Sequence, residues 1–89
     1  MQSFRGTVTN AEQQTISVAG MLGSHSIVAG VQTLSGYFYL PEGSSSIGGK
    51  APYRLVLDDG RSGEIHILEY LSGLDQRTRA EFKVIGPLR

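Results

Sequence analysis

The chain has 89 residues, a formal net charge of zero and no cysteine. This length predicts one domain, residues 1–89, and the missing cysteine excludes disulfides, thiolate catalysis and zinc or iron–sulfur sites with cysteine ligands. Non-specific nucleic-acid binding and electrostatic membrane binding both need a basic surplus, so 8 basic and 8 acidic residues disfavour both kinds of partner.

The N-terminal part of the chain predicts a β-hairpin. Apolar and polar residues alternate in Phe4–Val8 and again in Thr15–Val18, which is the two-residue period of strands. The polar stretch Asn10–Gln13 between them is typical of a turn. After this hairpin we expect the glycine-bounded segment Gly20–Gly23 to break the sheet.

The middle of the chain predicts further strands and a loop. Ser26–Val31 and Leu34–Leu40 are rich in β-branched and aromatic residues, and each contains one glycine at which a bulge or bend is expected. Both faces of Tyr37–Leu40 are apolar, so we expect this strand to be covered on both sides. The Gly- and Ser-rich segment Glu42–Lys50 then predicts a flexible loop within the domain.

The clearest hairpin is Tyr53–Ile67, whose register follows from its side-chain pattern. A two-residue turn, Asp59–Gly60, would mix the apolar and polar faces of the two strands. A three-residue loop, Asp58–Gly60, keeps the faces apart and pairs Tyr53 with Ile65, with Gly60 in the left-handed conformation. Because a register error turns every side chain to the wrong face, the sequence predicts the longer loop.

That register assigns a role to each acidic residue of the hairpin. Arg54 lies opposite Glu64, a cross-strand pair that stabilises a sheet by about 0.2–1 kcal/mol when it forms. Asp58 and Asp59 act as turn formers rather than as metal ligands beside His66. The inward face consists of the apolar positions Tyr53, Leu55, Leu57, Ile65 and Ile67.

The last strand is predicted over Arg79–Ile85, after a polar loop at Ser72–Thr78. Its inward positions are Ala80, Phe82 and Val84, and no segment predicts a helix of ten residues. Together the elements predict an all-β fold: a small antiparallel β-barrel or two-sheet sandwich of six to seven hairpin-connected strands.

One internal similarity raises the question of a duplication. Phe4–Val18 aligns without gaps on Tyr53–Ile67, 49 positions further along the chain. Any two amphipathic hairpins align in this way, and we favour this explanation. The alternative is a domain of two related halves.

Two segments resemble functional motifs but fail on spacing or geometry. A phosphate-binding loop at Gly49–Lys50 would need glycine in place of Ser44 and a hydroxyl residue in place of Ala51. His25 stands between two serines, but neighbouring residues of a strand point to opposite faces, so the imidazole would not reach either hydroxyl. The sequence therefore predicts no catalytic residue, no cofactor and no metal ligand.

Two functional hypotheses are favoured over a third, an enzyme that depends on His25 or His66. The first is a non-enzymatic interaction or assembly module, which binds a protein partner or a second copy of itself through sheet edges. The second is a binder of single-stranded nucleic acid or a small ligand, similar in architecture to OB or SH3 barrels, that uses Tyr37, Tyr39, Arg54 and Arg61. For the two tyrosines, the simpler expectation is that they fill the core or its rim.

The N-terminal segment Met1–Arg5 lacks the basic and apolar runs of a signal peptide. No apolar stretch approaches the roughly 20 residues of a membrane span. We therefore expect a cytoplasmic location, while the sequence leaves the oligomeric state open.

Overall fold

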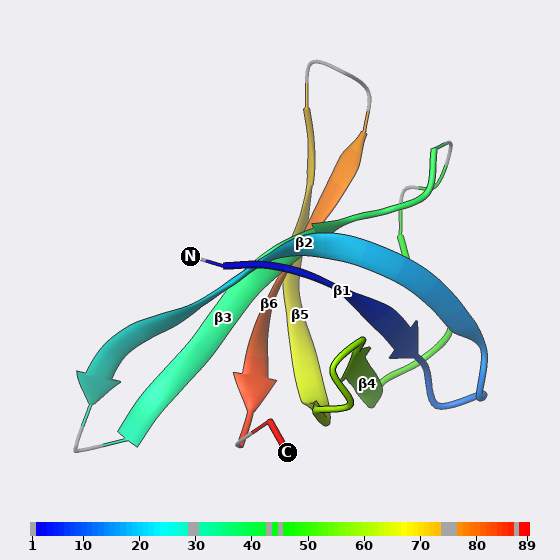
Figure 1. Cartoon of the computed structure of the whole chain (residues 1–89). Helices are drawn as coiled ribbons and strands as arrows, with labels where there is room; N and C mark the ends of the chain where they lie inside the picture. Colours follow the sequence, from blue (N-terminus) through cyan, green and yellow to red (C-terminus); the bar gives the residue numbers. More distant parts are fainter. Residues whose placement is uncertain (1, 29–30, 43, 45, 74–76, 87) are drawn as a thin grey trace.

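The structure is a computed structural model, which describes residues 2–28, 31–42, 44, 46–73, 77–86 and 88–89. These residues form six strands, named here in chain order: β1 (Gln2–Thr9), β2 (Thr15–Val28), β3 (Val31–Tyr39), β4 (Tyr53–Leu57), β5 (Ser62–Ser72) and β6 (Thr78–Ile85). Every pairing is antiparallel, and the strands close into a barrel in the order β1-β2-β3-β6-β5-β4 (Figure 1). The predicted all-β fold is therefore confirmed as a barrel rather than a sandwich.

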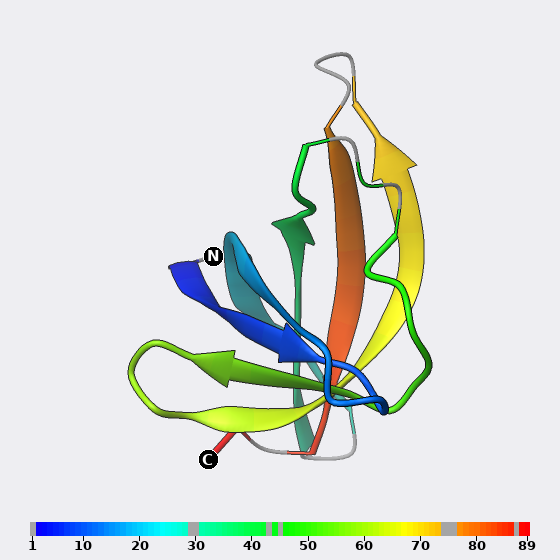
Figure 2. The same ribbon diagram turned by 90° about the vertical axis from the view of Figure 1, so that its right-hand side faces the viewer.

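Two hairpins extend beyond the body of the barrel. Figure 1 shows the β2–β3 hairpin projecting to the lower left and the β5–β6 hairpin projecting upward. In the view of Figure 2, the segment between β3 and β4 passes in front of the β5–β6 hairpin. The molecule is accordingly elongated, with principal extents of 40 × 30 × 22 Å.

The two halves of the chain have the same topology. Strands β1–β3 and β4–β6 each form a meander, and the halves join through β1 with β4 and β3 with β6. The first turn of each half also has the same hydrogen bonds: Asn10 donates to Gln14 as Leu57 donates to Arg61, with N···O distances of 3.0 and 2.7 Å. Equivalent positions are thus 47 residues apart, so the gap-free alignment at 49 was displaced by two residues.

The β4–β5 hairpin has the predicted register. Tyr53 lies opposite Ile65, and the loop is Asp58–Gly60 with Gly60 at φ 96°. Arg54 lies opposite Glu64, but its Nη2 donates instead to the Ser62 hydroxyl at 3.1 Å. The expected ion pair is absent from the described residues, because the guanidinium extends diagonally across the hairpin.

The inward positions predicted for the second hairpin and the last strand line the barrel interior. Among the side chains that the structure describes, ten apolar ones are at most 6% exposed: Val8, Val18, Phe38, Leu40, Leu55, Leu57, Ile65, Ala80, Phe82 and Val84. Tyr53 and Ile67 are partly buried against this core. Two glycines lie opposite buried phenylalanines, Gly20 opposite Phe38 and Gly36 opposite Phe82.

The glycine-bounded segment does not break the sheet as expected. Strand β2 continues through Gly20–Gly23 and pairs with β3, with a register shift between Ser24 and Ile27. A Cβ atom at Gly20 would overlap the carbonyl oxygen of Tyr37, so this glycine permits a close approach of two strands.

Two expectations for the middle strands were wrong. Ser26–Val31 does not form one strand, because Val28 ends β2 and pairs with Val31, which begins β3; residues 29 and 30 lie outside the described part of the chain. Strand β3 is also covered on one side only. Phe38 is fully buried, whereas Tyr37 is half-buried and Tyr39 is 36% exposed on the outer face.

Candidate binding surfaces

Barrel closure leaves part of β5 open on one side. β4 pairs with β5 over Ser62–Ile65, whereas β6 pairs with β5 from Glu64 to Ser72. Among the described residues, no strand pairs with the other side of β5 over residues 66–72. We call these residues the β5 edge. Their outward-directed backbone groups are available to another strand.

The side chains of the β5 edge are unusually apolar for exposed positions. Leu68 is 54% exposed and lies where the β5–β6 register shifts. Tyr70 and Leu71 are each slightly more than a third exposed. The surface of this projecting strand therefore combines unpaired backbone with apolar side chains.

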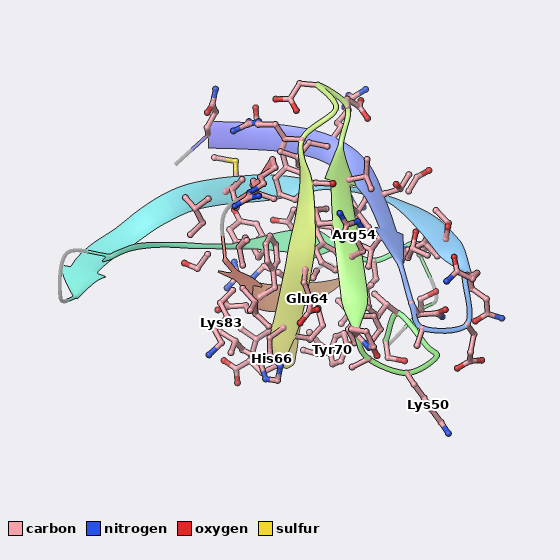
Figure 3. The ribbon with its side chains drawn as sticks, turned by 90° about the horizontal axis from the view of Figure 1, so that it is seen from below. Lys50, Arg54, Glu64, His66, Tyr70 and Lys83 are labelled. Atoms are coloured by element: carbon pink, nitrogen blue, oxygen red, sulfur yellow. The ribbon has the colours of Figure 1, made fainter. Side chains whose placement is uncertain are left out.

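The segment after β3 contacts the inner side of the same strand. The Ile47 N–H donates to the Tyr70 hydroxyl at 3.4 Å, and Ile47 packs on the core. Burial raises the pKa of Tyr70, an effect that the Ile47 hydrogen bond partly offsets. Figure 3 shows Tyr70 on the side of β5 that faces the segment with Lys50, whereas His66 and its cross-strand neighbour Lys83 lie on the other side.

The outer face of the barrel carries a second candidate surface. Cross-strand pairing places four outward residues in one row over β1, β2, β3 and β6: Arg5, Ala19, Tyr39 and Arg79. Asp58 extends the row, since its N–H donates to the carbonyl of Arg5 at 2.9 Å. The row thus begins with two residues of opposite charge and continues to an aromatic ring.

The two outward tyrosines contact each other, and each also contacts an arginine. The rings of Tyr37 and Tyr39 pack edge to face with centroids 5.7 Å apart. The guanidinium of Arg79 lies 4.5 Å from the Tyr37 centroid, and that of Arg77 lies 5.0 Å from the Tyr39 centroid. Arg79 also forms an ion pair with Glu81 at 3.0 Å. These contacts hold both rings in position on the surface.

An open hollow of about 640 Å³ lies beside the tyrosine pair, and we call it the Ala19 hollow. Its lining includes Ala19, Met21, Tyr37, Tyr39, Arg5 and Asp58. A second hollow of about 260 Å³ lies on the other side of Tyr39, against Leu71, Arg77 and Arg79. Tyr39 therefore separates two depressions of one outer face.

The structure brings together only part of the predicted binding set. Tyr37 and Tyr39 are neighbours, but Arg54 lies on β4 and is bonded to Ser62. Arg61 lies in the β4–β5 turn, where its Nε forms an ion pair with Asp59 at 2.9 Å. The Arg61 backbone N–H, more than its guanidinium, lowers the pKa of Asp59.

The arginines that contact the tyrosines were not identified from the sequence. Arg79 occupies an outward position of the last predicted strand, which is a usable signal. What the sequence lacked was the pairing of β3 with β6, which places Arg79 opposite Tyr39. Arg77 precedes β6 and gave no comparable pattern.

The structure also bears on the metal site that the sequence raised for the β4–β5 hairpin. Among the described residues, no three His, Asp or Glu side chains lie close enough to hold a metal ion, so Asp58, Asp59, Glu64 and His66 form no such group. The side chains of Ser24, His25 and Ser26 lie outside the described part of the structure. No helix in the described ranges is long and apolar enough to cross a membrane.

Comparison of the chain with protein-family models, curated proteins and solved structures finds no match. The function must therefore be inferred from the two surfaces themselves.

Proposed function

We propose that the chain is a non-enzymatic interaction module that adds a β-strand from a second copy of itself along the β5 edge. One observation supports the proposal above the others: the barrel body is closed, yet residues 66–72 of β5 lack a strand on one side among the described residues. Unpaired strand edges favour addition of a strand, because main-chain hydrogen bonds supply affinity without a particular sequence.

The side chains of the edge favour a protein partner. Leu68 and Leu71 expose apolar surface that an added strand would cover. Natural sheets usually protect such an edge with lysine or proline, and neither residue occurs in 66–72. The register shift at Leu68 gives some protection, but it leaves the residues beyond it free to pair.

Charge and symmetry favour a second copy of the chain. The formal net charge is zero, so two copies experience no net long-range repulsion. Two β5 edges that pair antiparallel form an isologous contact with a two-fold axis. A register centred on Tyr70 places Glu69 opposite Leu71, whereas a register centred on Glu69 would place two carboxylates opposite each other. We therefore expect the Tyr70-centred register.

Size-exclusion chromatography with light scattering tests this proposal over a range of protein concentrations. The expected result is a dimer that dissociates on dilution and is lost in Leu68→Lys. Ile85→Lys is the matched control, because Ile85 is similarly exposed, at 46%, but lies at the opposite end of the β5–β6 pair. A wild-type monomer at every accessible concentration would contradict the proposal.

The absence of an enzymatic activity and a cytoplasmic location belong to the same proposal. Both rest on sequence patterns and remain predictions. An activity that depends on His25 or His66 would contradict the first.

A further inference from the structure

We infer that the Ala19 hollow binds a small aromatic zwitterion, the chemistry of a free aromatic amino acid. This site is separate from the β5 edge and does not depend on the proposed self-association. Three properties of the hollow support the inference: its volume, its aromatic wall and the pair of opposite charges at its other side.

The volume and lining are those of a small-molecule site. About 640 Å³ lies within the roughly 300–1,000 Å³ that ligand sites occupy, and such sites combine apolar or aromatic walls with few polar groups. Ala19 is the smallest side chain of the row that crosses the hollow. Because the hollow is open, a flat ring suits it better than a bulky group.

The aromatic wall is already positioned for a ring. Tyr37 and Tyr39 line the hollow, whereas Arg77 and Arg79, which lie over their rings, do not. The arginines therefore hold the tyrosines from the side away from the hollow. A bound ring can pack against the remaining surface without ordering either tyrosine first, which lowers the entropic cost of binding.

The polar side of the hollow carries one positive and one negative group. Arg5 and Asp58 both line it and are neighbours through their backbone hydrogen bond. Neither side chain forms an ion pair or hydrogen bond with the described residues, where the ion pairs are Arg61 with Asp59 and Arg79 with Glu81. Both groups are thus available to a ligand.

This pair of charges determines the ligand class. An α-amino acid carries its carboxylate and its ammonium on one carbon, which matches two neighbouring charged side chains, Arg5 on β1 and Asp58 directly after β4. The Arg5 guanidinium would bind the carboxylate, and the Asp58 carboxylate would bind the ammonium. A nucleotide matches less well, because its phosphate would face Asp58 as well as Arg5.

The distance from the charges to the wall fits the same ligand. Arg5 and Tyr39 are separated by the single residue Ala19 across three strands. Two strand spacings amount to about 10 Å between backbones. Arg5 binds the carboxylate at one end of this span, and the side chain of the amino acid lies over Ala19 toward the tyrosines.

L-Tryptophan is a suitable probe, because the chain contains no tryptophan and the fluorescence of the ligand can be excited selectively. We expect saturable binding of L-tryptophan that is tighter than binding of indole-3-propionate, which lacks the ammonium, and of tryptamine, which lacks the carboxylate. Arg5→Ala should weaken binding by about tenfold, since a hydrogen bond to a charged group contributes at least that factor.

Arg54→Ala is the matched control, because Arg54 is an exposed arginine of the outer face that does not line the hollow. It should leave binding unchanged, as should Leu68→Lys, which separates this site from the β5 edge. Tyr37→Ala and Tyr39→Ala should each weaken binding, with circular dichroism confirming that the variants are folded.

Three outcomes would overturn the inference. Equal binding of L-tryptophan and indole-3-propionate would show that Asp58 contributes nothing. Binding of adenosine monophosphate or a short oligothymidylate in preference to L-tryptophan would assign the hollow to nucleotides or single-stranded nucleic acid. If no probe bound saturably at millimolar concentration, the Ala19 hollow would not be a binding site for these compounds.

Discussion

The two ends of β5 have the same backbone conformation and opposite environments. At its beginning, β5 lies between β4 and β6, and Ile65 is 2% exposed. At its end, the strand retains β6 alone among its described neighbours, and Leu68 is 54% exposed. A single strand thus contributes to the core over one half and presents an open edge over the other.

The difference shows that strand propensity does not decide burial. Ile65 and Leu68 are both large aliphatic residues of β5, but Ile65 faces the barrel interior between β4 and β6, whereas Leu68 lies at the register shift, beyond the part of β5 that pairs with β4. Because hydrophobic stabilisation follows the apolar area removed from water, the first half of β5 should contribute most of the stability of the strand. The second half lacks a strand on one side among the described residues.

The largest expected effect is a contrast in stability within this strand. Ile65→Ala removes a fully buried side chain and should lower the free energy of unfolding by about 2–5 kcal/mol. Leu68→Ala should change it by no more than about 0.5 kcal/mol. Urea denaturation of monomeric protein measures both values. Equal costs would show that the two ends of β5 do not differ as described.

A second prediction concerns the turn between β1 and β2, which contains Asn10. Asn10 is 6% exposed, and its Oδ1 accepts the N–H groups of Glu12 and Gln14 at 2.9 and 3.0 Å. Asn10→Ala leaves both donors without this acceptor and should cost about 1–3 kcal/mol. Denaturant unfolding measures this cost.

The control for Asn10→Ala is Asp59→Ala, in the equivalent turn of the second half. Asp59 also accepts a backbone N–H, from Arg61 at 3.0 Å, but it is exposed. Water can replace this bond, so the cost should be clearly smaller. If Asp59→Ala lowered the free energy of unfolding more than Asn10→Ala, burial would not be what makes the Asn10 hydrogen bonds important.

Hydrogen exchange provides a third test of the same contrast. Backbone amides of the closed part of β5, around Ile65, should exchange only through global or near-global unfolding. Amides of residues 68–72 should exchange at least about tenfold faster in the monomer, which corresponds to ~1.4 kcal/mol in opening free energy. NMR detects each amide separately. Uniform protection along β5 would mean that the edge is covered.

The smallest expected effect depends on pH and on Tyr70. Burial raises the pKa of Tyr70 in the folded state, so folding favours its neutral form. This contribution is fully present below the pKa of an unfolded tyrosine, about 10, and is lost as pH rises through the folded pKa. The stability of the wild type should therefore fall more steeply above pH 10 than that of Tyr70→Phe. Parallel curves from denaturation at pH 9 to 11 would refute the assignment.

Local patterns predicted the backbone register of one hairpin. The Asp58–Gly60 loop, its register and the inward face from Tyr53 to Ile67 follow from alternation and from one glycine in the left-handed conformation. The inward positions of β6 follow from alternation in the same way. Both are decided by residues within about fifteen positions of one another, so no distant partner was needed.

Elements that depend on distant strands were predicted less well. Gly20 indicates a break when β2 is considered alone, but beside Tyr37 of β3 the same glycine allows close strand approach. Tyr37 and Tyr39 indicate burial by composition, but they lie outside because Phe38 already fills the interior of β3. Arg54 faces Glu64 in register, and only the side-chain geometry directs it to Ser62.

The sequence by itself determined an all-β domain, the register of its second hairpin and the inward faces of its last strands. Those properties depend on a two-residue period and on turn geometry, which act over short separations. Only the tertiary structure decided that the sheet closes into a barrel, that β5 keeps an open edge, and that Arg79 rather than Arg54 accompanies the tyrosines. These features depend on which strands pair, although the strands are far apart in the sequence. The alternation of apolar and polar residues in a strand does not identify its partner, because every strand of the barrel has the same alternation.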